Sequence, residues 1–417
     1  MSKINLYKVN IFVFILLYIS LILGFVFNEN LNYGSYIDWV GAYVNPIKDF
    51  SENFSYTILN YDQYGNRHSP AYLIILSSIL KIGFSIDFVR LIHLHFCLLL
   101  ILIFYKCLRL QFRNIEKDTL QLVSLVIFLS PTFRSLAIWP DSRIIGLILF
   151  VLTIYFFIKF MRKNNMKFAF YCAFTLILTS YISPNFSVFF IFFYYFFFKK
   201  LRFLNFSYLI MISAILSFPM LYYLFILDIN FLIAGKTPGK EHNFNLDFNL
   251  SNKILIITSI FLFHILPIIF NLIDRNDLFR YLKKNFILLL SLLLVCIYFF
   301  NYEVNFTGGG VFFQASNFIF ENNYLFFLIC FFSLVITGYI SSLNYSNFLL
   351  IVLTILSNLQ NSIYHKYYEP FFLIITLILF KNLKFENFFK SKKSILFLYS
   401  YNLIFALFRL FKNKYLV

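Results

Sequence analysis

The chain has 417 residues, of which 61% are hydrophobic and 13% are charged. Soluble domains are roughly 45–50% apolar and about 25% charged, so this composition excludes a soluble globular domain and indicates an all-α polytopic membrane protein. The net charge of +17 does not indicate nucleic acid as a partner, because the basic residues lie mostly in short segments between apolar runs. The 62 Phe and 30 Tyr look like the product of AT-rich coding, and we infer no function from them.

Apolar runs of about 17–22 residues can cross a hydrocarbon core roughly 30 Å thick as helices. The sequence predicts about 12–13 such transmembrane helices in a single domain covering residues 1–417. The expected spans lie near residues 9–27, 86–105, 119–137, 142–161, 166–183, 185–198, 205–227, 253–273, 285–300, 322–342, 346–363, 370–383 and, more weakly, 394–411. Lys3 and Lys8 precede the first span and no small-residue cleavage site follows it, so we interpret it as uncleaved.

Six basic clusters set the expected orientation, because Lys and Arg are concentrated in cytoplasmic loops. We place in the cytoplasm Lys3/Lys8, Lys106/Arg109/Arg113/Lys117, Arg162/Lys163/Lys167, Lys199/Lys200/Arg202, Arg275/Arg280/Lys283/Lys284 and Lys381/Lys384/Lys390/Lys392/Lys393. The chain must then cross exactly twice between Lys8 and Lys106, and the run from Ala71 to Ile82 is too short to add a crossing. We expect that run to be an interfacial or re-entrant helix on the outer side, which makes residues 28–85 one large external loop.

The external loop contains the first candidate for catalysis. Asp38 lies about ten residues beyond the first span, beside Tyr36 and Trp39. A carboxylate at a membrane surface can act as a general base toward an acceptor hydroxyl or amine, and aromatic rings can stack on a sugar. The alternative is a solvated loop acid beside interfacial aromatic residues.

The same loop ends in Arg67-His68-Ser69-Pro70. Ser69 suits a helix N-cap and Pro70 suits the first turn, so we expect His68 near a helix N-terminus at the membrane surface. There His68 would help to bind a phosphate or a metal. The alternative is a capping segment with an incidental histidine.

Charged residues also surround the expected external turn near residue 140. Asp141 and Arg143 lie in this turn, and the alternative to a functional role is that they are interfacial, with Asp141 capping the next helix. Arg134 lies one turn before the end of its span, where a guanidinium suits bidentate contact with phosphate. Its alternative is snorkelling toward the surface.

A last polar group precedes Pro370 at the start of a span. It comprises His365, Lys366, Tyr367 and Glu369, which suit a phosphate or diphosphate; the alternative is anchoring at the interface. The five cysteines lie in apolar runs without a CxxC pair, so no metal-ligand set is predicted.

The order of these features resembles the N-terminal half of the GT-C-type glycosyltransferases, the polytopic class that includes protein O-mannosyltransferases and lipid A aminoarabinose transferases. The matching features are the early loop Asp38, the run His68-Ser69-Pro70-Ala71-Tyr72-Leu73, Arg90 entering the next span, Ser130-Pro131 and Pro140-Asp141-Ser142. The resemblance covers residues 1–165, a GT-C-like N-terminal module, and leaves residues 166–417 as variable C-terminal helices.

The resemblance implies an inverting transfer of a sugar from a polyprenyl-phosphate donor to a lipid-linked or glycan acceptor on the outer face, with Asp38 as the base. His68 and Asp141 fall where the class has residues that line the active cavity. The chain departs from the common pattern because it has no adjacent acid pair at Asp38, has Ser69-Pro70 in place of Pro-Pro, and shows no soluble C-terminal domain. No cofactor is specified, and the use of a divalent metal is left open.

Two other functions stay open at this stage. A polysaccharide polymerase or ligase acting on lipid-diphosphate glycans would depend on Arg134, Arg143 and His365 instead of Asp38. A lipid or polysaccharide transporter would show mid-span charges and internal repeats, whereas the charges lie mainly at span ends. The expected partners are the lipid-linked donor, the acceptor and membrane lipids, without nucleic acid. The expected location is a bacterial inner (plasma) membrane, with an endoplasmic reticulum membrane as the alternative.

Overall fold

The computed structural model describes residues 6–32, 34–66, 68–229, 249–303, 308–358, 360 and 362–415. Across these residues the backbone forms helices and turns without a β-strand, and an isolated antiparallel bridge pairs Gly308 with Tyr364. The prediction of an all-α protein is therefore confirmed. Arg67, in the predicted loop motif, lies outside the described residues.

The chain divides into two compact units, which we describe separately. The N-terminal unit comprises Phe14–Gln111, Phe133–Asn245 and Arg409–Val417. The C-terminal unit comprises Met1–Val13, Phe112–Thr132 and Leu246–Phe408. Three helices contribute residues to both units, namely α1 (Leu6–Val26), α8 (Pro131–Ile138) and α20 (Lys392–Tyr415).

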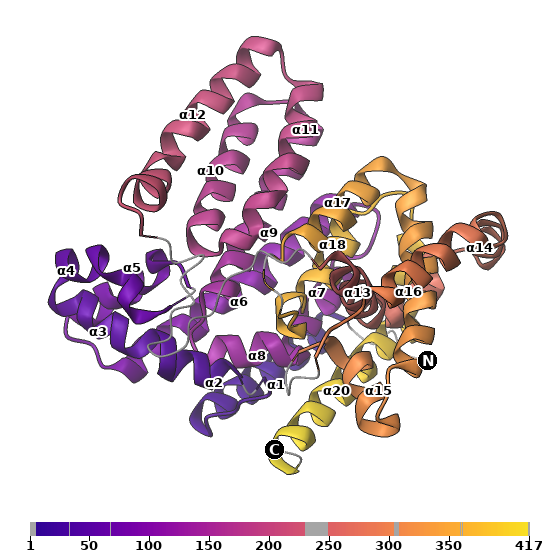
Figure 1. The fold of residues 1–417 in the computed structure, drawn as a ribbon, viewed down its shortest axis with the longest axis horizontal. Helices are drawn as coiled ribbons and strands as arrows, with labels where there is room; N and C mark the ends of the chain where they lie inside the picture. Colours follow the sequence, from indigo (N-terminus) through magenta and orange to yellow (C-terminus); the bar gives the residue numbers. More distant parts are fainter. Residues whose placement is uncertain are drawn as a thin grey trace. The chain divides into compact units, whose positions relative to one another are not determined.

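The N-terminal unit begins with short helices and continues with long ones (Figure 1). Its other elements are α2 (Gly34–Asp38), the π-helical turn η1 (Trp39–Tyr43), α3 (Val44–Glu52), α4 (Phe54–Leu59), η2 (Tyr61–Tyr64), α5 (Pro70–Lys81), α6 (Ile86–Gln111), α9 (Ser142–Lys163), α10 (Met166–Ile182), η4 (Pro184–Phe189), α11 (Phe190–Lys200), α12 (Phe203–Leu221) and η5 (Tyr222–Ile226). Helix α9 packs against α6 and α10, and α10 also contacts α12. A Cβ at Gly146 would collide with the Ser183 side chain, so a glycine is needed where α9 meets the end of α10.

Aromatic rings fill the space between α9, η4 and α11. The Phe150 ring lies 4.7 Å from Phe186 and 4.9 Å from Phe189, measured between centroids. Two turns of α9 further on, Phe157 meets Phe193 edge to face at 5.1 Å. Such offset and T-shaped pairs stabilise a core beyond the effect of buried area alone.

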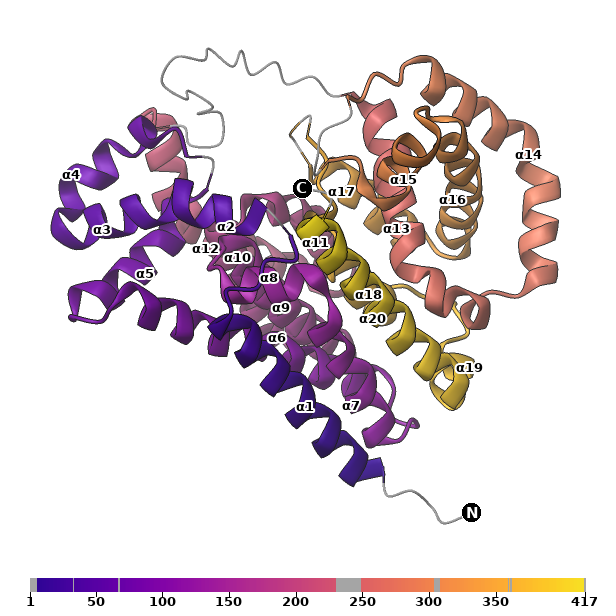
Figure 2. The ribbon, with the colours of Figure 1, turned by 90° about the horizontal axis from the view of Figure 1, so that it is seen from below.

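The C-terminal unit surrounds α13 (Leu250–Leu272), which contacts α14 (Arg275–Tyr298), α15 (Gly310–Phe320) and α16 (Tyr324–Leu343) (Figure 2). Its remaining elements are α7 (Lys117–Leu125), η3 (Val126–Leu129), α17 (Tyr345–Leu356), η6 (His365–Tyr367), α18 (Phe371–Ile378) and α19 (Phe385–Lys390). Most side chains of α13 are buried, in keeping with a sequence that is mainly apolar around the whole helix.

Eight helices in the described residues are long and apolar enough to cross a membrane: α1, α6, α9, α12 with η5, α13, α14, α16 and α20. A ninth is reached if α7, η3 and α8 count as one span broken at Ser130-Pro131. Each of the eight overlaps a predicted span, so the multi-pass class is confirmed. The count is lower than the predicted 12–13 because the segments 166–183, 185–198, 346–363 and 370–383 fold into helices of 17 residues or fewer.

Helix α5 agrees with the prediction for the end of the first loop. The Ser69 side chain accepts a hydrogen bond from the Ala71 amide, and Pro70 occupies the first helical turn. The helix has 12 residues. At about 1.5 Å per residue it reaches roughly 18 Å, too short for the roughly 30 Å hydrocarbon core.

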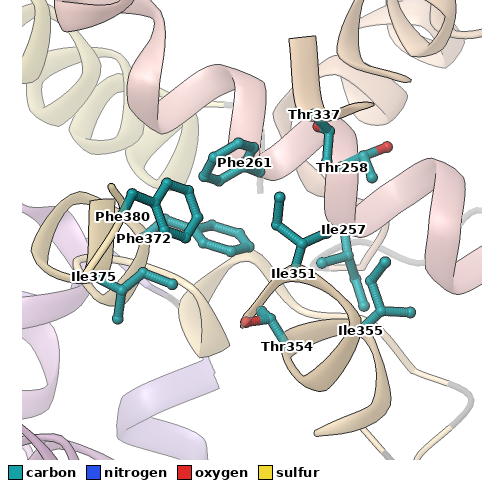
Figure 3. A pocket seen from close by; sticks show the side chains of 10 residues that line it. All are labelled: Ile257, Thr258, Phe261, Thr337, Ile351, Thr354, Ile355, Phe372, Ile375 and Phe380. Carbon is teal, nitrogen blue, oxygen red and sulfur yellow. The ribbon is translucent and has the colours of Figure 1, made fainter. Parts of the chain in front are cut away.

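A small cavity lies among α13, α16, α17 and α18 (Figure 3). Its walls are apolar, with Phe261 and Phe372 on one side and the hydroxyls of Thr258 and Thr337 on the other. Thr258 already donates to the Ile254 carbonyl of its own helix at 2.6 Å. None of the lining residues is charged, so the cavity does not suit a phosphate-bearing substrate.

Candidate functional site

Two carboxylates converge on one guanidinium at the start of α9. Arg143 Nη2 lies 2.6 Å from Asp38 Oδ2, at the end of α2, and 2.7 Å from Asp141 Oδ2. Asp141 is the N-cap of α9 and accepts from the Arg143 amide at 2.8 Å and from Arg143 Nε at 2.9 Å. The structure therefore brings Asp38 to the predicted turn residues Asp141 and Arg143, and Asp38 and Arg143 are 105 positions apart in the chain.

The two acids have different environments. Asp141 is 1% exposed, whereas the Asp38 side chain is 30% exposed. Burial raises the pKa of Asp141, but the charges of Arg143 and His68 outweigh that effect and hold this pKa below its ordinary value. Asp141 is thus a fixed anion that positions Arg143, and Asp38 is the acid that solvent can reach.

His68 joins the same cluster through Tyr43 and Ser142. The Tyr43 hydroxyl lies 2.9 Å from His68 Nδ1, donates to Ser142 Oγ at 3.0 Å and accepts from the Ser142 amide at 2.9 Å. Tyr43 is fully buried, and burial raises its pKa well above the ordinary value, so the phenol keeps its proton. Neither Tyr43 nor Ser142 was predicted as a site residue, because an isolated Tyr or Ser in a polar loop has no distinguishing pattern.

Arg134 has a partner that the sequence did not indicate. Its Nε donates to Glu29 Oε1 at 2.6 Å, its Nη2 donates to Glu29 Oε2 at 2.7 Å, and Nη2 also donates to the Ser20 carbonyl at 3.0 Å. This bidentate pair joins the segment after α1 to α8. The contact seen for Arg134 is thus a structural ion pair, and its predicted contact with substrate stays a prediction.

A second cluster lies within the C-terminal unit. His365 and Glu369 are four residues apart, with Nε2 and Oε2 separated by 3.7 Å, and the His264 ring of α13 lies 4.7 Å from the His365 ring. Glu369 is 4% exposed and accepts from Ser130 Oγ at 2.6 Å and from Thr132 Oγ1 at 2.8 Å. His264 was missed in the sequence, although a histidine inside a long apolar run is itself a signal.

The other two residues predicted near Pro370 have contacts with aromatic and polar neighbours. The Lys366 ammonium lies 5.6 Å from the Tyr364 ring centroid. The Tyr367 hydroxyl donates to Gln360 Oε1 at 3.3 Å. These contacts are compatible with anchoring, and the phosphate-binding role stays a prediction.

Comparisons with known proteins found no relative. No protein-family model, no curated protein and no solved structure matches the chain. The fold defines the class, an all-α multi-pass membrane protein. The chemistry of the clusters around Arg143 and His365 is the basis for a more specific function.

Proposed function

We propose that this protein is a membrane glycosyltransferase of the GT-C type, which moves a sugar from a polyprenyl-phosphate donor to a lipid-linked or glycan acceptor at the outer face of the membrane. The observation that carries the proposal is the partly exposed Asp38 carboxylate, 2.6 Å from Arg143 and beside the buried Asp141. An accessible base next to a fixed guanidinium is the pair of groups that sugar transfer from a phosphate requires.

In this proposal Asp38 takes the proton of the acceptor hydroxyl while that oxygen bonds to the anomeric carbon of the sugar. The bond from this carbon to the phosphate oxygen breaks on the opposite face, and its electron pair leaves with polyprenyl phosphate. A single displacement of this kind inverts the anomeric centre. No covalent sugar–enzyme intermediate is involved.

Arg143 meets the charge that develops on the departing phosphate. Asp141 accepts from the amide and Nε of Arg143, which keeps the planar guanidinium at the start of α9, where a donor phosphate would compete with Asp38 for its Nη groups. Donor binding would thereby release Asp38 from its ion pair and leave it basic. His68 and Tyr43 fix the position of Ser142 at the beginning of α9 and so support the cluster.

The test uses the full-length protein in proteoliposomes with a panel of polyprenyl-phosphate sugars and a readout of released polyprenyl phosphate. Asp38→Asn keeps the shape of the side chain and removes its basicity, so turnover should fall by about 10²–10⁴-fold with donor binding retained. Glu52→Gln is the matched control, because Glu52 is an exposed acid in the same loop and should be replaceable without loss.

Two results would overturn the proposal. One is full activity of Asp38→Asn on any donor that the wild type consumes. The other is a wild type that consumes lipid-diphosphate glycans and no lipid-phosphate sugar, which is the result expected of a polysaccharide polymerase or ligase.

A further inference from the structure

The cluster of His264, His365 and Glu369 has a donor set that the proposed sugar transfer does not use. One ligand atom from each residue lies within 4.8 Å of the other two, and all three residues are buried. Two imidazoles and a carboxylate form one of the ligand sets with which proteins bind zinc and leave a fourth position open. His264 and His365 lie far apart in the chain, so no sequence spacing indicated this set.

His264 provides an independent reason to expect a ligand. It is 8% exposed within α13, and its Nε2 is buried without a hydrogen-bond partner in the described part of the chain. A buried polar atom without a partner costs free energy, and more so in a helix long and apolar enough to span a membrane. A cation held between the two imidazole rings and the carboxylate would offset that cost.

The separations are close to those of an occupied site. Nitrogen and oxygen ligands lie about 2.0–2.2 Å from zinc, so neighbouring ligand atoms of a tetrahedral site are roughly 3.3–3.6 Å apart. The pair of His365 Nε2 and Glu369 Oε2 is already at 3.7 Å. The remaining pairs are within 4.8 Å and would close by about 1 Å through side-chain rotation.

The carboxylate is also oriented by groups behind it. Ser130 Oγ donates to Glu369 Oε1 and Thr132 Oγ1 donates to Glu369 Oε2. Hydrogen bonds of this kind fix the direction of a ligating carboxylate in metal sites. Phe263 and Phe405 pack around His365, with ring centroids 5.4 Å away in each case, and limit water at the site.

We propose that His264, His365 and Glu369 bind one divalent transition-metal ion, with zinc as the ion that this donor set suits best. The ion would connect α13 to η6, which holds His365, and to Glu369 in the segment before α18. Its fourth position would be open to water or to an anionic oxygen. The proposal is independent of the glycosyltransferase activity, because every readout below is a binding or stability measurement.

The experiment uses the full-length chain, purified in detergent with a tag that contains no histidine and stripped with a chelator. Zinc is returned and its stoichiometry is measured by mass spectrometry, and Co²⁺ serves as a spectroscopic substitute whose visible absorption reports tetrahedral nitrogen and oxygen ligands. We expect about one ion per chain, a visible Co²⁺ band, and a melting temperature that rises with zinc concentration.

His264→Leu and Glu369→Gln should each abolish the Co²⁺ band and the zinc-dependent rise in melting temperature. His95→Leu is the matched control, because His95 is an exposed-face histidine on α6 whose contacts are with Tyr18 and its own helix, and it should keep both signals. His264→Leu adds an apolar side chain to an apolar helix, so it should stay folded by circular dichroism.

Three outcomes would overturn the proposal: a wild type that takes up no zinc or cobalt, uptake that survives His264→Leu, or uptake that His95→Leu removes to the same extent. All three outcomes are measured without the activity assay used for Asp38. Failure of one proposal therefore leaves the other standing.

Discussion

At the scale of single residues, two aspartates contact Arg143 and differ in their environments. Asp141 is enclosed and held by the amide and guanidinium of Arg143, while Asp38 touches the same guanidinium from a partly exposed position. Two residues of the same type thus have different environments within one cluster, and of the two Asp38 is the one open to solvent.

Asp141 should make the stability of the fold depend on pH. Its pKa in the folded state lies below the ordinary value of 3.8, so the unfolded chain binds this proton more tightly. The ion pair therefore stabilises the fold above about pH 4, and this contribution is lost as the pH falls further through the lowered pKa. Asp141→Asn keeps a good N-cap without the charge, so its melting temperature should change less than that of the wild type on acidification.

Thermal melts of both proteins from neutral pH to about pH 3 would check this expectation. Glu52→Gln should follow the wild type, because Glu52 is exposed. Parallel curves for wild type and Asp141→Asn would show that the ion pair with Arg143 contributes nothing to stability.

The sequence singled out four residues that the structure places in one cluster, and their roles stay predictions. Asp141 and Arg143 stood out because charged residues at span ends are costly, Asp38 because of its aromatic neighbours in the loop, and His68 because a helix start follows it. Glu29 and Tyr43 were missed, since their contacts span more than 20 positions and only the packed chain creates them. His264 was missed although its place inside a long apolar run was a signal; its neighbour His365 is 101 positions away.

At the scale of elements, the pair of Glu29 and Arg134 connects the end of α1 to α8. Both side chains are largely buried, with exposed fractions of 17% and 7%. Glu29→Gln leaves the guanidinium uncompensated, so the free energy of unfolding should fall by about 3–5 kcal/mol. Reversible unfolding of the protein in mixed micelles by sodium dodecyl sulfate would measure the change.

The double variant Glu29→Gln/Arg134→Gln separates structure from substrate contact. If the pair is structural, removing both charges should recover much of the lost stability, because no uncompensated charge is left buried. A double variant that regains stability and still fails to bind donor would show that Arg134 also contacts substrate.

The extent of a helix was predictable only where one uninterrupted helix covers a whole apolar run. Each of the eight long helices overlaps a predicted span, although α14 begins at Arg275 instead of residue 285, and the Ser69 cap with Pro70 placed the start of α5 correctly. The run predicted as one span at 185–198 instead forms η4 and α11, because Pro184 begins a tight 3₁₀ turn. Apolarity alone does not distinguish such broken segments from a continuous span.

At the scale of the whole molecule, the expected orientation depends on charge alone and can be tested directly. Ser55→Cys lies exposed in the predicted external loop, and Asn114→Cys lies exposed in a predicted cytoplasmic turn. The five native cysteines are buried, so they should give little background. In intact cells, a membrane-impermeant maleimide should label the first variant and reach the second only after lysis.

Equal labelling of both variants from outside would contradict the orientation and, with it, the outer-face location of the proposed transfer. The composition was sufficient to predict a polytopic helical protein, because 61% hydrophobic residues is far above the roughly 45–50% of soluble domains. The composition does not indicate which helices contact one another, because those contacts depend on how individual side chains fit together.

The high Phe content has a consequence for packing, because phenylalanine rings fill the space between α9, η4 and α11. Among lipid tails, a leucine gains nothing from leaving the solvent, because the solvent is as apolar as the leucine. Ring quadrupoles attract one another with about 0.5–1.5 kcal/mol per pair in addition to the effect of buried area. A genome drifting toward GC would exchange Phe for Leu by single-base changes that keep each position apolar. Drift of that kind would loosen this unit while a hydropathy profile still indicated the same apolar spans.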